Sequence, residues 1–153
     1  MGNEDIVARL ERLEQEIVGV TALEAARGLL HTYARGCDTK QPEAVAACFA
    51  MDATLDAGAA PFEGREAIFG FYDAALRGNS CHVVGAADMV TAADGTVESS
   101  AIFCSVHLAG DVPQIHYGTY DDRIAVAPDG HAEFVSRRIT ITGSVPIPQG
   151  SAS

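Results

Sequence analysis

The chain has 153 residues, of which 48% are hydrophobic and 20% are charged, a composition that supports one domain with a sizeable core. Its formal net charge of -11 at pH 7 disfavours nucleic acid and anionic membranes as partners, because both require a concentrated basic surface. No apolar run approaches the roughly 20 residues of a membrane-spanning helix, and the acidic start of the chain differs from a basic secretion signal. We therefore expect a cytoplasmic protein that binds neither nucleic acid nor membranes.

The first third of the chain has the pattern of three helices. Apolar residues recur at spacings of four, three and four, which predicts an amphipathic helix from about residue 5, on Ile6, Leu10, Leu13 and Ile17. A capping-box pattern at residues 21–24 predicts a second helix over about 21–35. Pro42 fits the first turn of a third helix, which is expected to carry Phe49 and to end at Asp52.

The remaining pattern begins with a short strand at 53–57, a return strand at 62–63 and a fourth helix that opens at 64–66 and stops at Gly78 and Asn79. From residue 80 the chain changes to long β runs separated by turn signals, of which Asp94-Gly95 is typical of a hairpin. Four strands are predicted, over about 81–91, 96–109, 115–126 and 131–142, with the second turn at Gly110-Asp111.

Helices followed by a long meander predict the α+β class. We expect the N-terminal helices to cover one face of a strongly curved sheet that encloses a pocket. One domain is expected over residues 1–143, followed by a tail over 144–153. Four cysteines lie in apolar segments without a C-x-x-C pair, so buried free thiols are favoured over disulfides or zinc.

Motifs in residues 33–38, 48–53, 62–68, 82–85 and 118–123 carry a resemblance that spans about 5–143. Together they resemble the nuclear transport factor 2-like superfamily, in its SnoaL-like branch with scytalone dehydratase and related dehydratases and dehydrochlorinases. This superfamily includes dehydratases, dehydrohalogenases, isomerases, cyclases and modules without catalytic activity, so the resemblance predicts the fold more strongly than the reaction. The resemblance implies a cone-shaped α+β barrel, with N-terminal helices packed on a strongly curved, mixed, mostly antiparallel sheet. It also implies a homo-oligomer, a dimer or trimer formed through the sheet face.

The resemblance assigns roles to individual residues. Asp38 and His82 match the Asp-His pair of scytalone dehydratase and of the hexachlorocyclohexane dehydrochlorinase, and His107 matches the second histidine of the dehydratase. Tyr33, five residues before Asp38, matches the spacing of a bile-acid dehydratase of the same superfamily.

Other positions match or depart from scytalone dehydratase. Thr119 and Asp121 match a serine and an asparagine that contact its ligand, and Phe103 and Phe49 are expected to add apolar contacts to the substrate. Cys37 and Ala57 stand where the dehydratase has water-binding tyrosines, so Tyr33 is expected to supply the missing phenol.

The chemistry of these side chains supports an acid-base site. An aspartate that accepts a hydrogen bond from one ring nitrogen of His82 fixes the tautomer and leaves the other nitrogen as a general base. His107, across the pocket, is expected to hydrogen-bond a carbonyl or to protonate a departing hydroxide. We therefore expect a lyase of the dehydratase type that acts on a hydrophobic cyclic or aromatic small molecule and uses no cofactor and no metal.

Alternatives remain open from the sequence. An isomerase or polyketide cyclase uses the same base without a leaving group, and a binding or assembly module uses the fold without catalysis. Asp38 also fits a turn or helix cap, and Tyr33 also fits core packing. Arg137 and Arg138 must point to opposite sides of their strand, which leaves open which one faces the pocket. No role is assigned to three further histidines, His31, His116 and His131.

Overall fold

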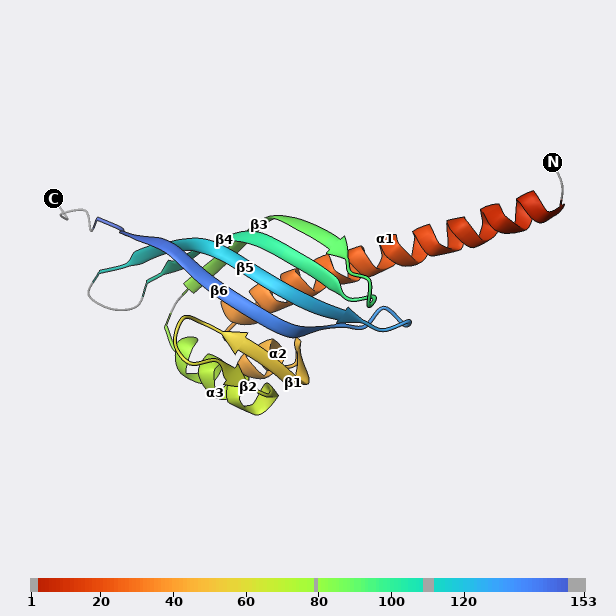
Figure 1. Ribbon diagram of the computed structural model, residues 1–153. Coiled ribbons are helices and arrows are strands. Elements are labelled where there is room, and N and C mark those ends of the chain that lie inside the picture. Colours follow the sequence, from red (N-terminus) through yellow and green to blue (C-terminus); the bar gives the residue numbers. More distant parts are fainter. Residues whose placement is uncertain (1–2, 79, 109–111, 149–153) are drawn as a thin grey trace.

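A computed structural model describes residues 3–78, 80–108 and 112–148, with backbone only at residues 3 and 4. A long helix, α1 (Asn3–Asp38), is followed by the short helix α2 (Pro42–Ala46) and later by α3 (Arg65–Ala75) (Figure 1). The strands are β1 (Phe49–Asp56), β2 (Phe62–Glu63), β3 (Ser80–Thr91), β4 (Val97–His107), β5 (Gln114–Val126) and β6 (Ala132–Pro146). Within the described residues, no helix is both long and apolar enough to cross a membrane.

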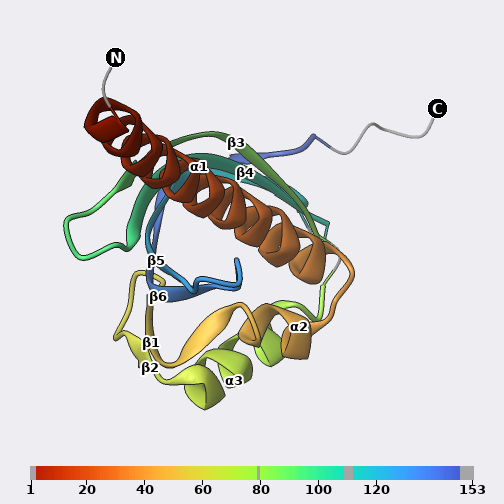
Figure 2. The same ribbon diagram turned by 90° about the vertical axis from the view of Figure 1, so that its right-hand side faces the viewer.

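The six strands form one sheet in the order β2-β1-β6-β5-β4-β3. β1 pairs with β6 in parallel, and every other neighbouring pair is antiparallel. α1 crosses the curved face of this sheet, while α2 and α3 lie beside β1 (Figure 2). The predicted α+β class with a curved, mostly antiparallel sheet is confirmed, and the sheet is open, with β2 and β3 at its edges.

Two predicted helix boundaries are wrong. α1 continues through the capping-box residues 21–24, because a helix already under way satisfies their backbone N–H groups with carbonyls four residues earlier. The third helix ends at Ala46 instead of Asp52, and Phe49 begins β1. Phe49 is fully buried beside Phe134, its register partner on β6, so tertiary packing overrides the local helical pattern.

The other predicted elements are present with shifted ends. The short strand, the return strand, the fourth helix and the four long strands all occur, and β6 extends to Pro146, into the segment predicted as a tail. The predicted stop at Asn79 and the turn at Gly110-Asp111 lie outside the described residues.

A buried ion pair lies at the centre of the core. Arg137 faces the helices with a fully buried side chain, and its Nε and Nη2 donate to the two carboxylate oxygens of Asp122, each at 2.7 Å. Its guanidinium carbon also lies 4.0 to 4.4 Å from the ring centroids of Tyr33, Tyr120 and Phe134. Burial lowers the pKa of Arg137, but the contact with Asp122 outweighs burial, so the pKa is raised and the group stays charged.

The neighbouring Arg138 points to the opposite side, where it contacts Asp56 at 3.2 Å with most of its side chain exposed. The open question about the two arginines is therefore answered: Arg137 enters the core and Arg138 does not.

Replacing Arg137 with Met should lower the free energy of unfolding by about 3 to 5 kcal/mol, because Asp122 then stays buried without its partner. The matched control, Arg138→Met, removes an exposed pair and should change stability by less than about 1 kcal/mol. Urea unfolding of the two variants measures both effects. Equal losses in the two variants would contradict a structural role for the buried pair.

Candidate functional site

A pocket of about 210 Å³ lies between α1, α3 and the curved sheet. Its lining is largely apolar and aromatic but includes several groups that exchange or donate protons, namely Tyr33, Cys37, Tyr72, His82, His107 and His116. Cavities of this kind, with a few convergent polar groups in apolar walls, are typical of small-molecule sites.

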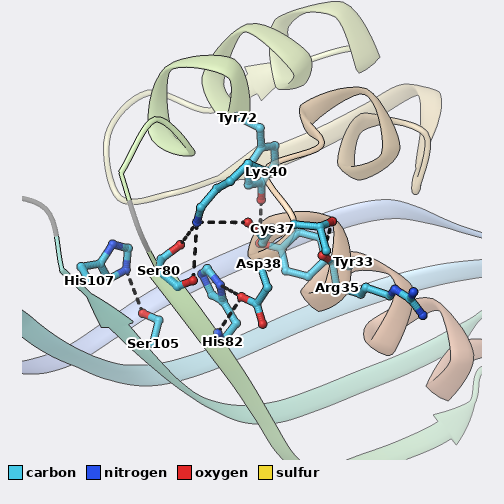
Figure 3. Close-up of polar contacts among 11 residues, drawn as sticks. Tyr33, Arg35, Cys37, Asp38, Lys40, Tyr72, Ser80, His82, Ser105 and His107 are labelled. Atoms are coloured by element: carbon cyan, nitrogen blue, oxygen red, sulfur yellow. Dashed lines mark hydrogen bonds and ion pairs between the residues drawn. The ribbon is translucent and has the colours of Figure 1, made fainter.

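Asp38 is the last residue of α1 and joins that helix to β3. Its Oδ1 accepts two hydrogen bonds, from the backbone N–H and from Nδ1 of His82, each at 2.8 Å (Figure 3). The hydrogen bond predicted between these side chains is therefore present. Because Nδ1 donates to the carboxylate, Nε2 is the nitrogen that lacks a proton in the neutral ring. The His82 side chain is only 10% exposed, whereas that of Asp38 is 32% exposed, so the ring is shielded from water and the carboxylate is partly solvated.

His107 ends β4, and its ring centroid lies 6.0 Å from that of His82. Ser105 Oγ is 3.1 Å from His107 Nε2, and the ring centroid of His116 lies 4.8 Å from that of His107. Burial, followed by His116, His82 and Lys40, lowers the pKa of His107. His107 is therefore neutral at pH 7 and is able both to donate and to accept a hydrogen bond.

Lys40 brings a positive charge to this end of the pocket. Its Nζ donates to Ser80 Oγ at 2.6 Å, at the start of β3 (Figure 3). Within the described part of the chain, no group of three or more histidine, cysteine or carboxylate side chains is placed to hold a metal ion.

Tyr33 combines a pocket position with core packing. Its hydroxyl is 2.8 Å from that of Tyr72, its side chain is almost fully buried, and its ring makes edge contacts with four other aromatic rings. Burial raises the pKa of Tyr33 well above its ordinary value and also raises the pKa values of Tyr72 and Tyr120. These phenols therefore keep their protons and are able to donate hydrogen bonds.

The expected substrate contacts divide into three outcomes. Phe103 lines the pocket and stacks on Tyr120, with ring centroids 4.2 Å apart. Phe49 is a core residue that does not reach the pocket lining, because it packs against Phe134.

Thr119 and Asp121 lie on the opposite face of the sheet, so their prediction as contacts in this pocket is wrong. Side chains alternate along a strand, and Tyr120 and Asp122 are the ones that point inward. On the outer face, Asp121 accepts a hydrogen bond from Ser100 at 2.7 Å. It borders a larger and more open hollow of about 560 Å³, which contains no histidine and is lined mainly by charged and hydroxyl side chains.

Sequence reasoning missed His116, Tyr72 and Tyr120 as pocket residues. His116 and Tyr120 share the inward alternation of β5, which was the available signal. Tyr72 was visible only as one of the apolar positions of α3, and the partner of its hydroxyl comes from α1.

The four cysteines are free, but they are not equally buried. Cys37 and Cys48 are buried as expected, Cys104 is partly buried, and Cys81 is exposed, which corrects the expectation for that residue. Burial raises the pKa of the Cys37 thiol to about 12 and that of Cys48 to about 11. The pocket thiol of Cys37 is thus protonated and a poor nucleophile.

The SnoaL-like domain model matches residues 18–138. The chain belongs to the SnoaL-like domain family. No curated protein matches this SnoaL-like chain in sequence.

Solved structures share the fold of this SnoaL-like domain. A candidate scytalone dehydratase from Novosphingobium aromaticivorans has a TM-score of 0.73 at 20% identity, covering 86% of this chain and 95% of that one. A hexachlorocyclohexane dehydrochlorinase, LinA type 2, has a TM-score of 0.73 at 16% identity, covering 92% and 93%. ActVI-ORFA from Streptomyces coelicolor has a TM-score of 0.66 at 16% identity, covering 78% and 96%.

In the folded protein, iodoacetamide should label Cys81 first and leave Cys37 and Cys48 unlabelled, because the latter thiols are buried and protonated. Peptide mass spectrometry over a time course measures the order, and a urea-unfolded sample is the control in which all four should react. Labelling of Cys37 as fast as Cys81 would contradict an inert pocket thiol.

Proposed function

We propose that this SnoaL-like domain is a cofactor-independent lyase of the dehydratase type. In the proposed reaction His82, oriented by Asp38, removes a proton from a hydrophobic cyclic or aromatic small molecule, and water or another leaving group departs. The observation that carries the proposal is the hydrogen bond of 2.8 Å between Asp38 Oδ1 and His82 Nδ1 at the wall of a pocket. A solvated surface histidine would not need a dedicated carboxylate to fix its tautomer.

The first step is transfer of a proton from carbon to His82 Nε2. The ring then becomes an imidazolium, which the Asp38 carboxylate stabilises across the existing hydrogen bond. A proton beside a carbonyl is the acidic kind that an imidazole base removes, so the proposed substrate carries a ketone or a related group.

The second step needs a donor for the substrate oxygen and a proton for the leaving group. His107 is neutral and lies across from His82, and the phenols of Tyr33 and Tyr72 keep their protons. One of these donors stabilises the enolate as its negative charge develops. The electron pair then forms a carbon–carbon double bond and the carbon–oxygen bond breaks. The leaving hydroxyl takes the proton from the His82 imidazolium, so it departs as water and the ring returns to its neutral form.

The pocket limits the substrate. Its volume of about 210 Å³ is below the roughly 300 to 1,000 Å³ of common ligand sites, which favours one ring or a small fused ring system. Two of the structural neighbours, a dehydratase and a dehydrochlorinase, are named after elimination reactions. Their likeness to this chain supports the same class of reaction.

An isomerase or polyketide cyclase is the second candidate function. Either enzyme would use the same base and the same donors. The isomerase would return the proton to another carbon, and the cyclase would let the carbanion attack a carbonyl carbon, whose oxygen then takes the proton. The Asp38–His82 contact favours both enzymes over a binding or assembly module, which needs no oriented base.

We also propose a homo-oligomer, because Val83, Ile102 and Tyr117 expose large apolar side chains on the sheet.

His82→Ala should lower kcat by about 10²- to 10⁴-fold and change KM little, because the base acts mainly in the transition state. The assay is a panel of hydroxylated cyclic ketones that gain conjugation when they lose water. Asp38→Asn should give an intermediate loss, because the amide contacts the ring but does not stabilise the imidazolium.

The matched control for the His82 variant is His131→Ala, at an exposed position beside a turn, which should keep wild-type turnover. Wild-type turnover by His82→Ala would refute the proposed base. The products distinguish the two enzyme candidates, since a lyase releases water and an isomerase conserves the mass of its substrate.

A further inference from the structure

The N-terminal half of α1 extends away from the sheet (Figure 1). Every described side chain from residue 5 to residue 18 is exposed. Residues 6–20 nevertheless carry five large apolar residues at heptad spacing, with exposed fractions between 43% and 64%: Ile6, Leu10, Leu13, Ile17 and Val20. A regular apolar stripe of this kind on an exposed helix marks an interaction surface.

The protein's own core does not cover this stripe. An α-helix turns about 100° per residue, so the stripe of residues 6–20 points roughly opposite to the face that buries Ala26, Leu30 and Tyr33 farther along α1. The sheet contacts the face that carries Ala26, Leu30 and Tyr33. The stripe is therefore a separate surface of the helix and not an exposed continuation of the core.

We propose that residues 6–20 of α1 form a self-association site, in which the same segment of a second copy packs in antiparallel orientation. In heptad terms Leu10 and Ile17 occupy the a positions, and Ile6, Leu13 and Val20 the d positions. In an antiparallel pair Leu10 packs against Leu13 of the second copy, and Ile6 against Ile17. Four of the five apolar residues of one copy thus meet an apolar residue of the other, and Val20 lies at the end of the overlap, opposite residue 3.

The flanking charges match this arrangement. Arg9 and Glu16 are both exposed and both occupy g positions of the heptad. In the antiparallel register Arg9 of each copy faces Glu16 of the other, so two-fold symmetry creates two attractive pairs.

Charges farther along the helix favour antiparallel over parallel packing. Glu24 and Arg27 are exposed and form an ion pair with each other. They occupy the next a and d positions of the heptad. A parallel dimer would align Glu24 with Glu24 and Arg27 with Arg27 of the second copy, which places like charges in contact. An antiparallel dimer places neither residue opposite its copy, because residue 20 of one chain faces residue 3 of the other.

The association through α1 differs from association through the sheet face. The two surfaces lie on different elements, so a variant of one leaves the other intact. Leu10→Glu combined with Leu13→Glu should raise the dimer Kd more than about 100-fold, because charges replace four buried leucines in the dimer. Glu is a good helix former, so helicity by circular dichroism should be retained.

Sedimentation equilibrium of the full chain, from about 1 to 100 µM, measures the effect on mass. The wild type is expected to associate, and the double variant is expected to have half the mass of the wild-type species. This holds whether the wild-type species is a dimer of single chains or a dimer of sheet-face oligomers. The control Val18→Glu lies on another side of the same helix and should keep the wild-type mass. A monomeric wild type, or a double variant with unchanged mass, would overturn the proposal.

A charge exchange tests the orientation. Arg9→Glu and Glu16→Arg should each raise the dimer Kd roughly tenfold, and the combined variant should restore wild-type association, because the pairs are reformed with exchanged signs. In a parallel dimer Arg9 would face Glu14, so rescue of Arg9→Glu by Glu14→Arg in place of Glu16→Arg would overturn the antiparallel register.

Discussion

The two hydrogen bonds that Asp38 accepts from His82 connect the helical layer to the sheet at the pocket. Asp38 is the last residue of a helix of 36 residues, and His82 lies near the start of β3. The bond from the backbone N–H fixes the carboxylate relative to the strand, and the bond from Nδ1 fixes the ring relative to the carboxylate. Both the tautomer of His82 and the direction of Nε2 follow from this arrangement.

The position of the Asp38–His82 pair depends in turn on where the sheet holds α1. Tyr33, five residues before Asp38, is enclosed by aromatic rings and lies over the charged guanidinium of Arg137. Asp122 neutralises that charge and fills two of its donors. The buried ion pair therefore supports the aromatic side chains that line the pocket. The same packing fixes the end of α1 that carries the Asp38 carboxylate.

The sequence predicted the fold class because helical and strand patterns are local, whereas the Asp38–His82 contact, between residues 44 positions apart, was predicted from the resemblance to the superfamily. Long strands bounded by Asp-Gly turns are visible in the sequence. The continuity of α1 through residues 21–24 was not predicted, because a capping-box sequence has the same letters inside a helix as at its start.

The failures in the site have a different cause. Thr119 and Asp121 were placed in the pocket by resemblance alone, whereas strand alternation turns Tyr120 and Asp122 inward and those two residues outward. Phe49 was assigned to a helix and to the substrate, and burial against Phe134 makes it part of a strand and of the core. Contacts such as that between the Tyr33 and Tyr72 hydroxyls join residues 39 positions apart, which no local pattern reveals.

Nitrogen-15 NMR of the imidazole rings tests the central claim most directly, and it needs no substrate. In the wild type, neutral His82 should carry its proton on Nδ1, with Nε2 showing the chemical shift of an unprotonated nitrogen, because Asp38 accepts from Nδ1. Asp38→Ala should remove this preference, since free imidazole favours a proton on Nε2. A proton on Nε2 of His82 in the wild type would contradict the account, because the nitrogen proposed as the base would already be occupied.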